Sequence, residues 1–123
     1  MSTITPSGLD ERRTSGEDPF VLDIRPVDDF ARGHIDDSHN VPVYGDLQRG
    51  TDASLRAHLD ELPADRSVIV VCKAGIVARR ATAVLSEEGY DASTLLGGMS
   101  GWNGYRNDTL GYKLRSLLWS LSG

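Results

Sequence analysis

The sequence predicts an α/β fold in which a central parallel sheet is flanked by helices. Short runs rich in valine and isoleucine, such as residues 67–71, alternate with segments whose apolar residues recur at helical spacing, such as residues 78–88. This alternation is typical of strands joined by helical crossovers, which pair in parallel and carry helices on both faces of the sheet. Four consecutive apolar residues in 67–71 indicate a central strand that is covered on both faces.

Length and composition favour a single domain. The chain has 123 residues, of which 39% are hydrophobic and 25% charged, and it contains no internal repeat. We expect one domain over residues 1–123, with its core at about 20–106, a short helical lead-in before it and a C-terminal helix at about 110–121.

Charge and hydropathy exclude several classes of partner. The net charge is −5, from 18 acidic and 13 basic residues, which argues against a nucleic-acid partner because such a partner favours a basic face. No run approaches the roughly 18 apolar residues of a membrane span. Residues 1–16 are polar and lack the apolar stretch of a secretory signal, so we expect a cytoplasmic location.

The first predicted helix lies within residues 1–19. Thr5 or Ser7 can cap it, Pro6 suits an early helical position, and Gly16 can end it.

A buried strand is predicted at residues 20–24, where the chain is apolar and β-branched. Pro26 ends this strand. We expect one or two helical turns over residues 27–32, with Phe30 and Val27 facing inward, and Gly33 stopping them.

The middle of the chain predicts a short edge strand and a helix. Residues 41–43 form the strand, because a proline at position 42 restricts it to an edge or a strand start. Leucines 55, 59 and 62 lie at helical spacing, which predicts a helix over residues 53–62 that ends before Pro63.

The strand at 67–71 leads directly into Cys72. After a short loop, residues 78–88 predict a helix with a stripe of apolar side chains, and Gly89 stands where a C-terminal glycine cap belongs. Residues 92–96 predict another strand, followed by Gly97-Gly98.

The last segment places five leucines on one face of a helix, at positions 110, 114, 117, 118 and 121. We expect this helix to close the core through that face. An exposed leucine face would instead favour dimerisation.

Cys72 is the candidate nucleophile. The chain has one cysteine, which cannot form an internal disulfide or a cysteine-rich zinc site, so we expect no metal. A lone cysteine is usually a small buried hydrophobe. Cys72, however, stands between a strand end and a helix start, where ligands bind in open α/β sheets. Inward-pointing loop amides and the helix dipole would favour a thiolate there, and equally a persulfide anion.

The residues after Cys72 fit that interpretation. Gly75 lets the loop turn tightly and lets its backbone approach an anion. Lys73 and Arg79 add positive charge nearby, although each could equally point to solvent.

Several motifs in this chain resemble signatures of the rhodanese-like domain family, in the family's order and spacing from about Val21 to Trp102. They are Val21–Arg25, Asp29-Phe30, Gly33–Ile35, Asn40–Pro42, Cys72–Gly75, Leu96–Met99 and Gly101-Trp102.

The resemblance implies a three-layer rhodanese-like fold of about five parallel strands, and a sulfurtransferase with a ping-pong mechanism. In that mechanism Cys72 takes sulfane sulfur from thiosulfate or a persulfide, holds it as a persulfide, and passes it to cyanide, a thiol or an acceptor protein. No metal or organic cofactor is required. The loop amides that would hold the anion belong to Lys73, Ala74, Gly75, Ile76, Val77 and Ala78.

One position departs from the family pattern. Many single-domain members carry an arginine five places after the cysteine, where this chain has Val77. The loop is therefore less cationic, and we expect weaker use of thiosulfate and a donor that carries less charge.

Other polar residues of the motifs are expected to have structural roles. Asp23 and Arg25 flank the end of the first strand and can pair with each other, although Arg25 could also face the anion. His34 and His39 are expected to form local hydrogen bonds rather than a catalytic pair with Cys72.

Two alternatives compete with the sulfurtransferase. A cysteine phosphatase or arsenate reductase needs an arginine six places after the cysteine, where this chain has Ala78, and a reductase also needs a second cysteine. A non-catalytic rhodanese-like module for regulation or partner docking stays open. The sequence indicates neither the acceptor, the pathway nor the oligomeric state.

Overall fold

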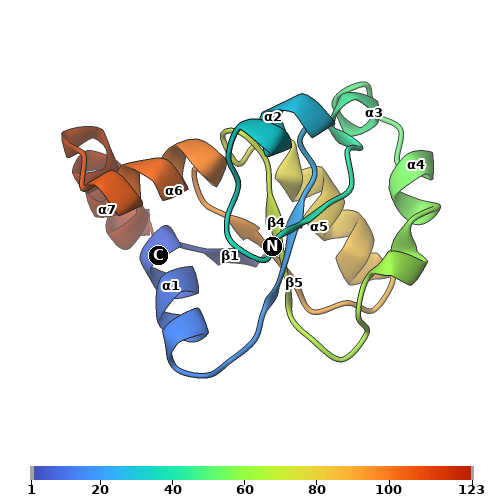
Figure 1. Ribbon diagram of the computed structural model, residues 1–123, viewed down its shortest axis with the longest axis horizontal. Helices are drawn as coiled ribbons and strands as arrows, with labels where there is room; N and C mark the ends of the chain where they lie inside the picture. Colours follow the sequence, from blue (N-terminus) through green and yellow to red (C-terminus); the bar gives the residue numbers. More distant parts are fainter. Residues whose placement is uncertain (1, 123) are drawn as a thin grey trace.

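The sheet lies at the centre of the molecule. The computed structural model describes residues 2–122. Within them, five strands pair in parallel in the order β1-β5-β4-β2-β3, which confirms the predicted fold class (Figure 1). The strands are β1 Thr3–Ile4, β2 Phe20–Asp23, β3 His39–Asn40, β4 Val68–Val71 and β5 Ala92–Leu95.

Helices cover both faces of the sheet. Figure 1 shows α1, α6 and α7 on one side of it, and α3, α4 and α5 on the other. No helix within residues 2–122 is both long and apolar enough to cross a bilayer. The helices are α1 Pro6–Thr14, α2 Val27–Arg32, α3 Tyr44–Gln48, α4 Ala53–Arg56, the 3₁₀ turn η1 Leu59–Glu61, α5 Ala78–Glu87, α6 Gly98–Asn107 and α7 Leu110–Ser122.

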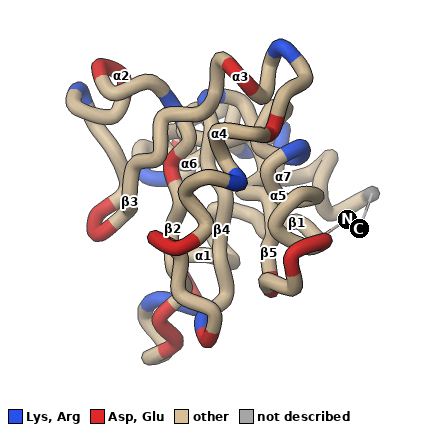
Figure 2. Tube along the Cα trace, turned by 90° about the vertical axis from the view of Figure 1, so that its right-hand side faces the viewer, with Lys and Arg blue, Asp and Glu red and all other residues tan. Residues whose placement is uncertain are grey.

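Strand β4 separates two apolar cores. Side chains alternate between the faces of a strand, so Val68 and Val70 join one buried cluster while Ile69 and Val71 join the other. All four are fully buried, as predicted for a central strand. In Figure 2 the tube is tan along β4, and most of the charged positions lie in the helices and loops around it.

The N-terminal helix begins as predicted. Thr5 caps α1 by accepting a hydrogen bond from the Gly8 N–H at 3.0 Å, and Pro6 is the first helical residue. The chain leaves the helix through Gly16, whose φ is +95°. The strand β1 was not predicted, because two residues are too few to show a period of two.

The edge strand lies earlier than predicted. Residues 41–43 do not form it; His39 and Asn40 do, pairing with Leu22 and Asp23. The chain then turns at Pro42, where the Val43 N–H bonds to the Val41 carbonyl at 2.8 Å.

The helix predicted over residues 53–62 is divided into α4 and η1. The His58 N–H bonds to Leu55 O, three residues back, instead of Ser54 O. The Ser54 carbonyl is taken by Nδ1 of the His58 ring at 2.7 Å, so the side chain replaces the helical hydrogen bond.

Helix α2 buries less than predicted. Phe30 is half-buried and stacks on His34 with ring centroids 3.9 Å apart. Val27 does not face inward: it is 58% exposed, and none of the residues of α2 is fully buried.

Helix α7 packs through aromatic residues and not through its leucines. The expectation that the leucine stripe closes the core is wrong, because these side chains are 57–81% exposed. Tyr112, Ser116 and Trp119 are half-buried at helical spacing and form the packed face. The glycines of α6 admit this face: a Cβ at Gly104 would lie 2.9 Å from Tyr112 Cβ, and one at Gly101 would lie 3.5 Å from the Trp119 ring.

A hydrogen bond ties α6 to α1. Tyr105 Oη donates to Asp10 Oδ2 at 2.6 Å. This hydrogen bond, with burial and the negative charge of Asp10, raises the pKa of Tyr105 to about 12.

We expect Asp10→Ala to lower the pKa of Tyr105 toward the ordinary tyrosine value of about 10, because it removes the acceptor and its charge. The measurement is the rise of phenolate absorbance with pH. Subtracting the curve of Tyr105→Phe isolates the titration of Tyr105, once in the wild-type background and once in the Asp10→Ala background. Identical difference curves in both backgrounds would contradict the prediction.

Candidate active site

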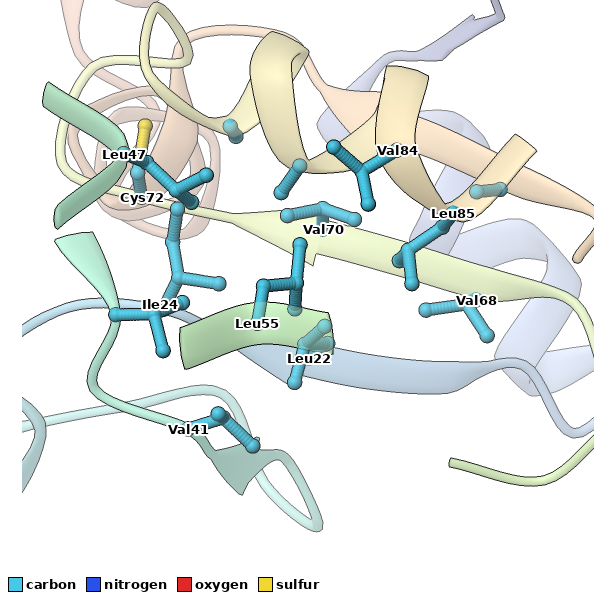
Figure 3. Close-up of a cluster of buried hydrophobic side chains, with 14 of the residues drawn as sticks. Leu22, Ile24, Val41, Leu47, Leu55, Val68, Val70, Cys72, Val84 and Leu85 are labelled. Atoms are coloured by element: carbon cyan, nitrogen blue, oxygen red, sulfur yellow. The ribbon is translucent and has the colours of Figure 1, made fainter. Parts of the chain in front are cut away.

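Cys72 lies at the carboxyl end of β4, in the row of Val68 and Val70 (Figure 3). It is 1% exposed. Its Sγ accepts a hydrogen bond from the Gly75 N–H at 3.1 Å. The strand therefore delivers the sulfur to the place where the chain turns toward α5, and the loop directs an amide at it.

The first two loop carbonyls are held by the N-terminus of α6. The Met99 N–H donates to Cys72 O at 2.8 Å, and the Ser100 N–H donates to Lys73 O at 3.0 Å. The N-terminal amides of a helix have no partner within the helix, so the loop satisfies them. In a trans peptide the N–H points opposite to the C=O, and the amides of Lys73 and Ala74 therefore point away from α6.

This junction requires glycine on both sides. Gly75 has φ +85°, and a Cβ there would lie 3.0 Å from Gly97 N and 3.1 Å from Leu95 O. Gly98 has φ +55°, and a Cβ there would lie 2.3 Å from Cys72 O. Two backbone segments thus pack directly against each other, with no side chain between them.

A pocket of about 340 Å³ opens at Cys72. None of its lining side chains is acidic. The lining residues are Tyr44, Gln48, Cys72, Lys73, Ala74, Ile76, Val77 and Arg80. A larger pocket, of about 500 Å³, includes none of residues 72–78.

The predicted loop residues differ in exposure. Lys73 and Ala74 are exposed at the pocket, and Ile76 is 71% exposed at its rim. Val77 lines the pocket but is only 9% exposed and belongs to the core. Ala78 is fully buried and begins α5.

The two arginines that follow the loop point to different places. Arg79 lines a separate pocket of about 320 Å³ together with Arg115 and Trp119. Arg80 lines the pocket at Cys72. The sequence prediction named Arg79 as an auxiliary residue and did not include Arg80. The sequence spacing could have indicated Arg80, because residues three apart share a helix face and Val77 was already assigned to the loop.

Tyr44 and Gln48 were also not predicted at this site. They belong to α3, a five-residue helix without a clear apolar period. Only the folded chain brings them beside the loop.

Asp23 and Arg25 form a buried pair. Arg25 donates from Nη2 to Asp23 Oδ2 at 2.8 Å and from Nε to Oδ1 at 3.0 Å, and both residues are less than 10% exposed. A further bond from Arg25 Nη2 reaches Gly33 O at 2.8 Å. Neither residue lines the pocket at Cys72. The contacts of the Arg25 guanidinium with Asp23 and Gly33 are therefore structural.

His34 forms a local hydrogen bond, as predicted, whereas the partner of His39 lies 22 residues away in the sequence. His34 Nδ1 donates to Phe30 O at 2.8 Å, and His39 pairs with Glu61 at 2.8 Å. Neither lines the pocket at Cys72. Among residues 2–122, no group of three or more His, Cys, Asp or Glu side chains is arranged to hold a metal ion.

Comparisons of this chain with a family model, with curated proteins and with solved structures all point to the same family. Residues 5–105 match the model of the rhodanese-like domain. The chain is 31% identical to "Thiosulfate sulfurtransferase GlpE" of Shewanella oneidensis over 91 residues, which cover 73% of this chain and 81% of that protein.

Larger proteins contain the same unit. The chain is 32% identical over 88 residues to "Adenylyltransferase and sulfurtransferase MOCS3-2" of Zea mays, covering 71% of this chain but only 18% of that protein. Among solved structures, a rhodanese-related protein from Thermoplasma volcanium has a TM-score of 0.71 and 25% identity, covering 85% of this chain and 93% of that one.

The junction between the loop and α6 can be tested with two glycines of positive φ. We expect Gly98→Ala to lower the free energy of unfolding by about 2–5 kcal/mol, from backbone strain and overlap with Cys72 O. Gly89→Ala is the matched control, because φ there is +92° but nothing lies within 4 Å of the added Cβ. It should cost about 1–2 kcal/mol. Urea unfolding measures both, and equal losses would show that the contact with Cys72 O contributes nothing.

Proposed function

Because the chain belongs to the family of rhodanese-like domains, we propose that it is a sulfurtransferase that carries sulfane sulfur as a persulfide on Cys72. The observation that supports this most directly is the position of the Cys72 sulfur. It accepts the Gly75 N–H and borders a pocket that contains no acidic side chain. Both features favour an anion at this sulfur.

In the first step the Cys72 thiolate attacks the outer sulfur of the donor. With thiosulfate, a bond forms between Sγ and the outer sulfur, and the bond from that sulfur to the sulfonate breaks. The electron pair leaves on sulfite, and the enzyme keeps a cysteine persulfide anion. The total charge of −3 is the same before and after the step.

In the second step a nucleophilic acceptor attacks the outer sulfur of the persulfide. With cyanide the products are thiocyanate and the regenerated Cys72 thiolate. One transfer is thus divided into two displacements at sulfur, which is nucleophilic covalent catalysis. A thiol or a protein acceptor would take the sulfur in the same way.

The loop would stabilise the anion in both steps. The amides of Lys73 to Ala78 follow Cys72 in the sequence, and the Gly75 amide already donates to Sγ. The junction with α6 fixes the loop before any substrate arrives, so no reorganisation is needed during transfer. No metal or organic cofactor takes part in either displacement.

The donor is expected to carry less charge than thiosulfate. Val77 is apolar where many single-domain members have arginine, and its side chain is packed in the core. A persulfide or polysulfide donor suits this pocket better than the compact thiosulfate dianion does.

Intact-mass measurement tests the proposal. We expect the protein to gain one sulfur atom when it is incubated with thiosulfate or with glutathione persulfide, and to lose it again on addition of cyanide. Cys72→Ser is the control and should gain none. If a folded protein gains no sulfur from either donor, the sulfurtransferase proposal fails and a docking module replaces it.

A charge introduced in the loop tests the role of Val77. We expect Val77→Arg to lower the KM for thiosulfate about tenfold, the effect of one charge-assisted hydrogen bond. Val27→Arg is the control and should leave the KM unchanged, because it adds the same charge at a side chain that is 58% exposed and does not line the pocket at Cys72. Val77 is packed in the core, so thermal unfolding must show that the variant folds. A folded Val77→Arg variant with unchanged KM would contradict the prediction.

A further inference from the structure

Arg80 is a cation in the pocket of Cys72 that has no carboxylate partner. Six of the eleven arginines form ion pairs within residues 2–122, as Arg25 does with Asp23. Arg80 instead donates from Nη1 to Leu47 O at 2.7 Å and to Gln48 O at 3.3 Å. Among residues 2–122 no acidic side chain pairs with it.

These two bonds hold the guanidinium in place without using all of its donors. A guanidinium has five N–H groups, and those on Nε and Nη2 of Arg80 have no partner among the described residues. The carbonyls of Leu47 and Gln48 belong to the end of α3, where a helix attracts positive charge. Arg80 is therefore anchored on one side and able to bind an anion on the other.

Apolar side chains also line the pocket that Cys72 and Arg80 share. Val77 lies one helical turn before Arg80 in the same pocket, and the Tyr44 side chain lines it as well. The volume of about 340 Å³ is that of roughly ten water molecules and falls in the range of pockets for small organic ligands. A compact oxyanion such as thiosulfate would leave most of this space unused.

We propose that the pocket binds an organic persulfide that bears a carboxylate, with its sulfane sulfur at Cys72, its carbon chain against Val77 and its carboxylate on Arg80. This assignment rests on the proposed function and names the donor class. Arg80 is then the residue that determines donor specificity, and the missing loop arginine is replaced by a cation in the first turn of α5.

The transfer balances without another reactant. The Cys72 thiolate attacks the terminal sulfur of the persulfide R–S–SH, and the bond between its two sulfurs breaks. The electron pair leaves on the thiolate R–S⁻, and the enzyme holds Cys72 as a protonated persulfide. Nothing is oxidised or reduced overall.

The experiment compares two donors with the same sulfur chemistry. Glutathione persulfide has two carboxylates, and its diethyl ester has none. We expect the wild-type protein to use the acid with a KM about tenfold below that of the ester, a modest factor because Arg80 is exposed to solvent. Arg80→Gln should raise the KM for the acid to that for the ester while leaving kcat and the KM for the ester unchanged.

Arg79→Gln is the matched control. It removes the same charge from the adjacent residue, which lines the pocket on the other side of the loop, and should leave both KM values unchanged. Arg80→Lys keeps the charge and should restore part of the preference for the acid. Thermal unfolding checks that loss of the bonds to α3 does not unfold the variants.

Three results would overturn the inference. They are equal use of the two donors by the wild type, equal effects of Arg80→Gln and Arg79→Gln, and loss of kcat with both donors in a folded Arg80→Gln protein. Each of these leaves sulfur transfer through Cys72 intact. Failure of the protein to gain sulfur from any donor is a different outcome, which removes the proposed function itself.

Discussion

The contact between the loop at Cys72 and the Gly97-Gly98 turn is the constraint on which the site depends. Two amides of α6 donate hydrogen bonds to the carbonyls of Cys72 and Lys73. The two backbone segments lie so close together that a side chain at position 98 would not fit between them. These bonds fix the orientation of the first loop peptides. The strand β4 brings the cysteine to this point, but the α6 end determines which way the following amides face.

The rest of the fold supports this contact from two sides. The alternating side chains of β4 bind it to a core under α5 and to a second core under α1 and α6. The pair of Asp23 and Arg25 holds the end of β2 and reaches the backbone at Gly33. A buried ion pair of this kind fixes the positions of the groups it joins, but it adds little to the free energy of unfolding because desolvation opposes the attraction. Here it holds β2, the neighbour of β4, at the edge where Cys72 lies.

Much of the fold could be predicted from the sequence because local rules agree with the tertiary structure. The strands around Val21 and Ile69 have continuous apolar runs, and the stripe of α5 has the period of a helix. The predictions failed where one contact overrides the local pattern. At position 58 a histidine ring takes the carbonyl that a helix would use. In α7 the aromatic face packs on glycines of α6, a match between two segments that no single-segment pattern reveals.

The candidate site also has a part that could be predicted from the sequence and a part that could not. The position of Cys72 and the need for Gly75 follow from the strand, the loop and the following helix, all of which are continuous in sequence. The other wall of the pocket comes from α3, about 25 residues earlier, and Tyr44 and Gln48 carry no motif that marks them. Arg80 could be predicted only in part. The helix period shows that it lies on the same face of α5 as Val77, but its hydrogen bond to Leu47 O depends on how α3 packs against α5.

The burial of Cys72 has a consequence for the chemical durability of such a carrier. At 1% exposure the empty thiol offers almost no surface to peroxide or to alkylating agents. A persulfide extends it outward by one S–S bond of about 2.05 Å, so the sulfur to be donated stands nearer the mouth of the pocket than Sγ does. The outer sulfur of the loaded state is thus more accessible than the empty thiol, which is reached only by a molecule that enters the pocket. Any damage in the loaded state would fall first on the outer sulfur, which the cell can reduce away without losing the cysteine.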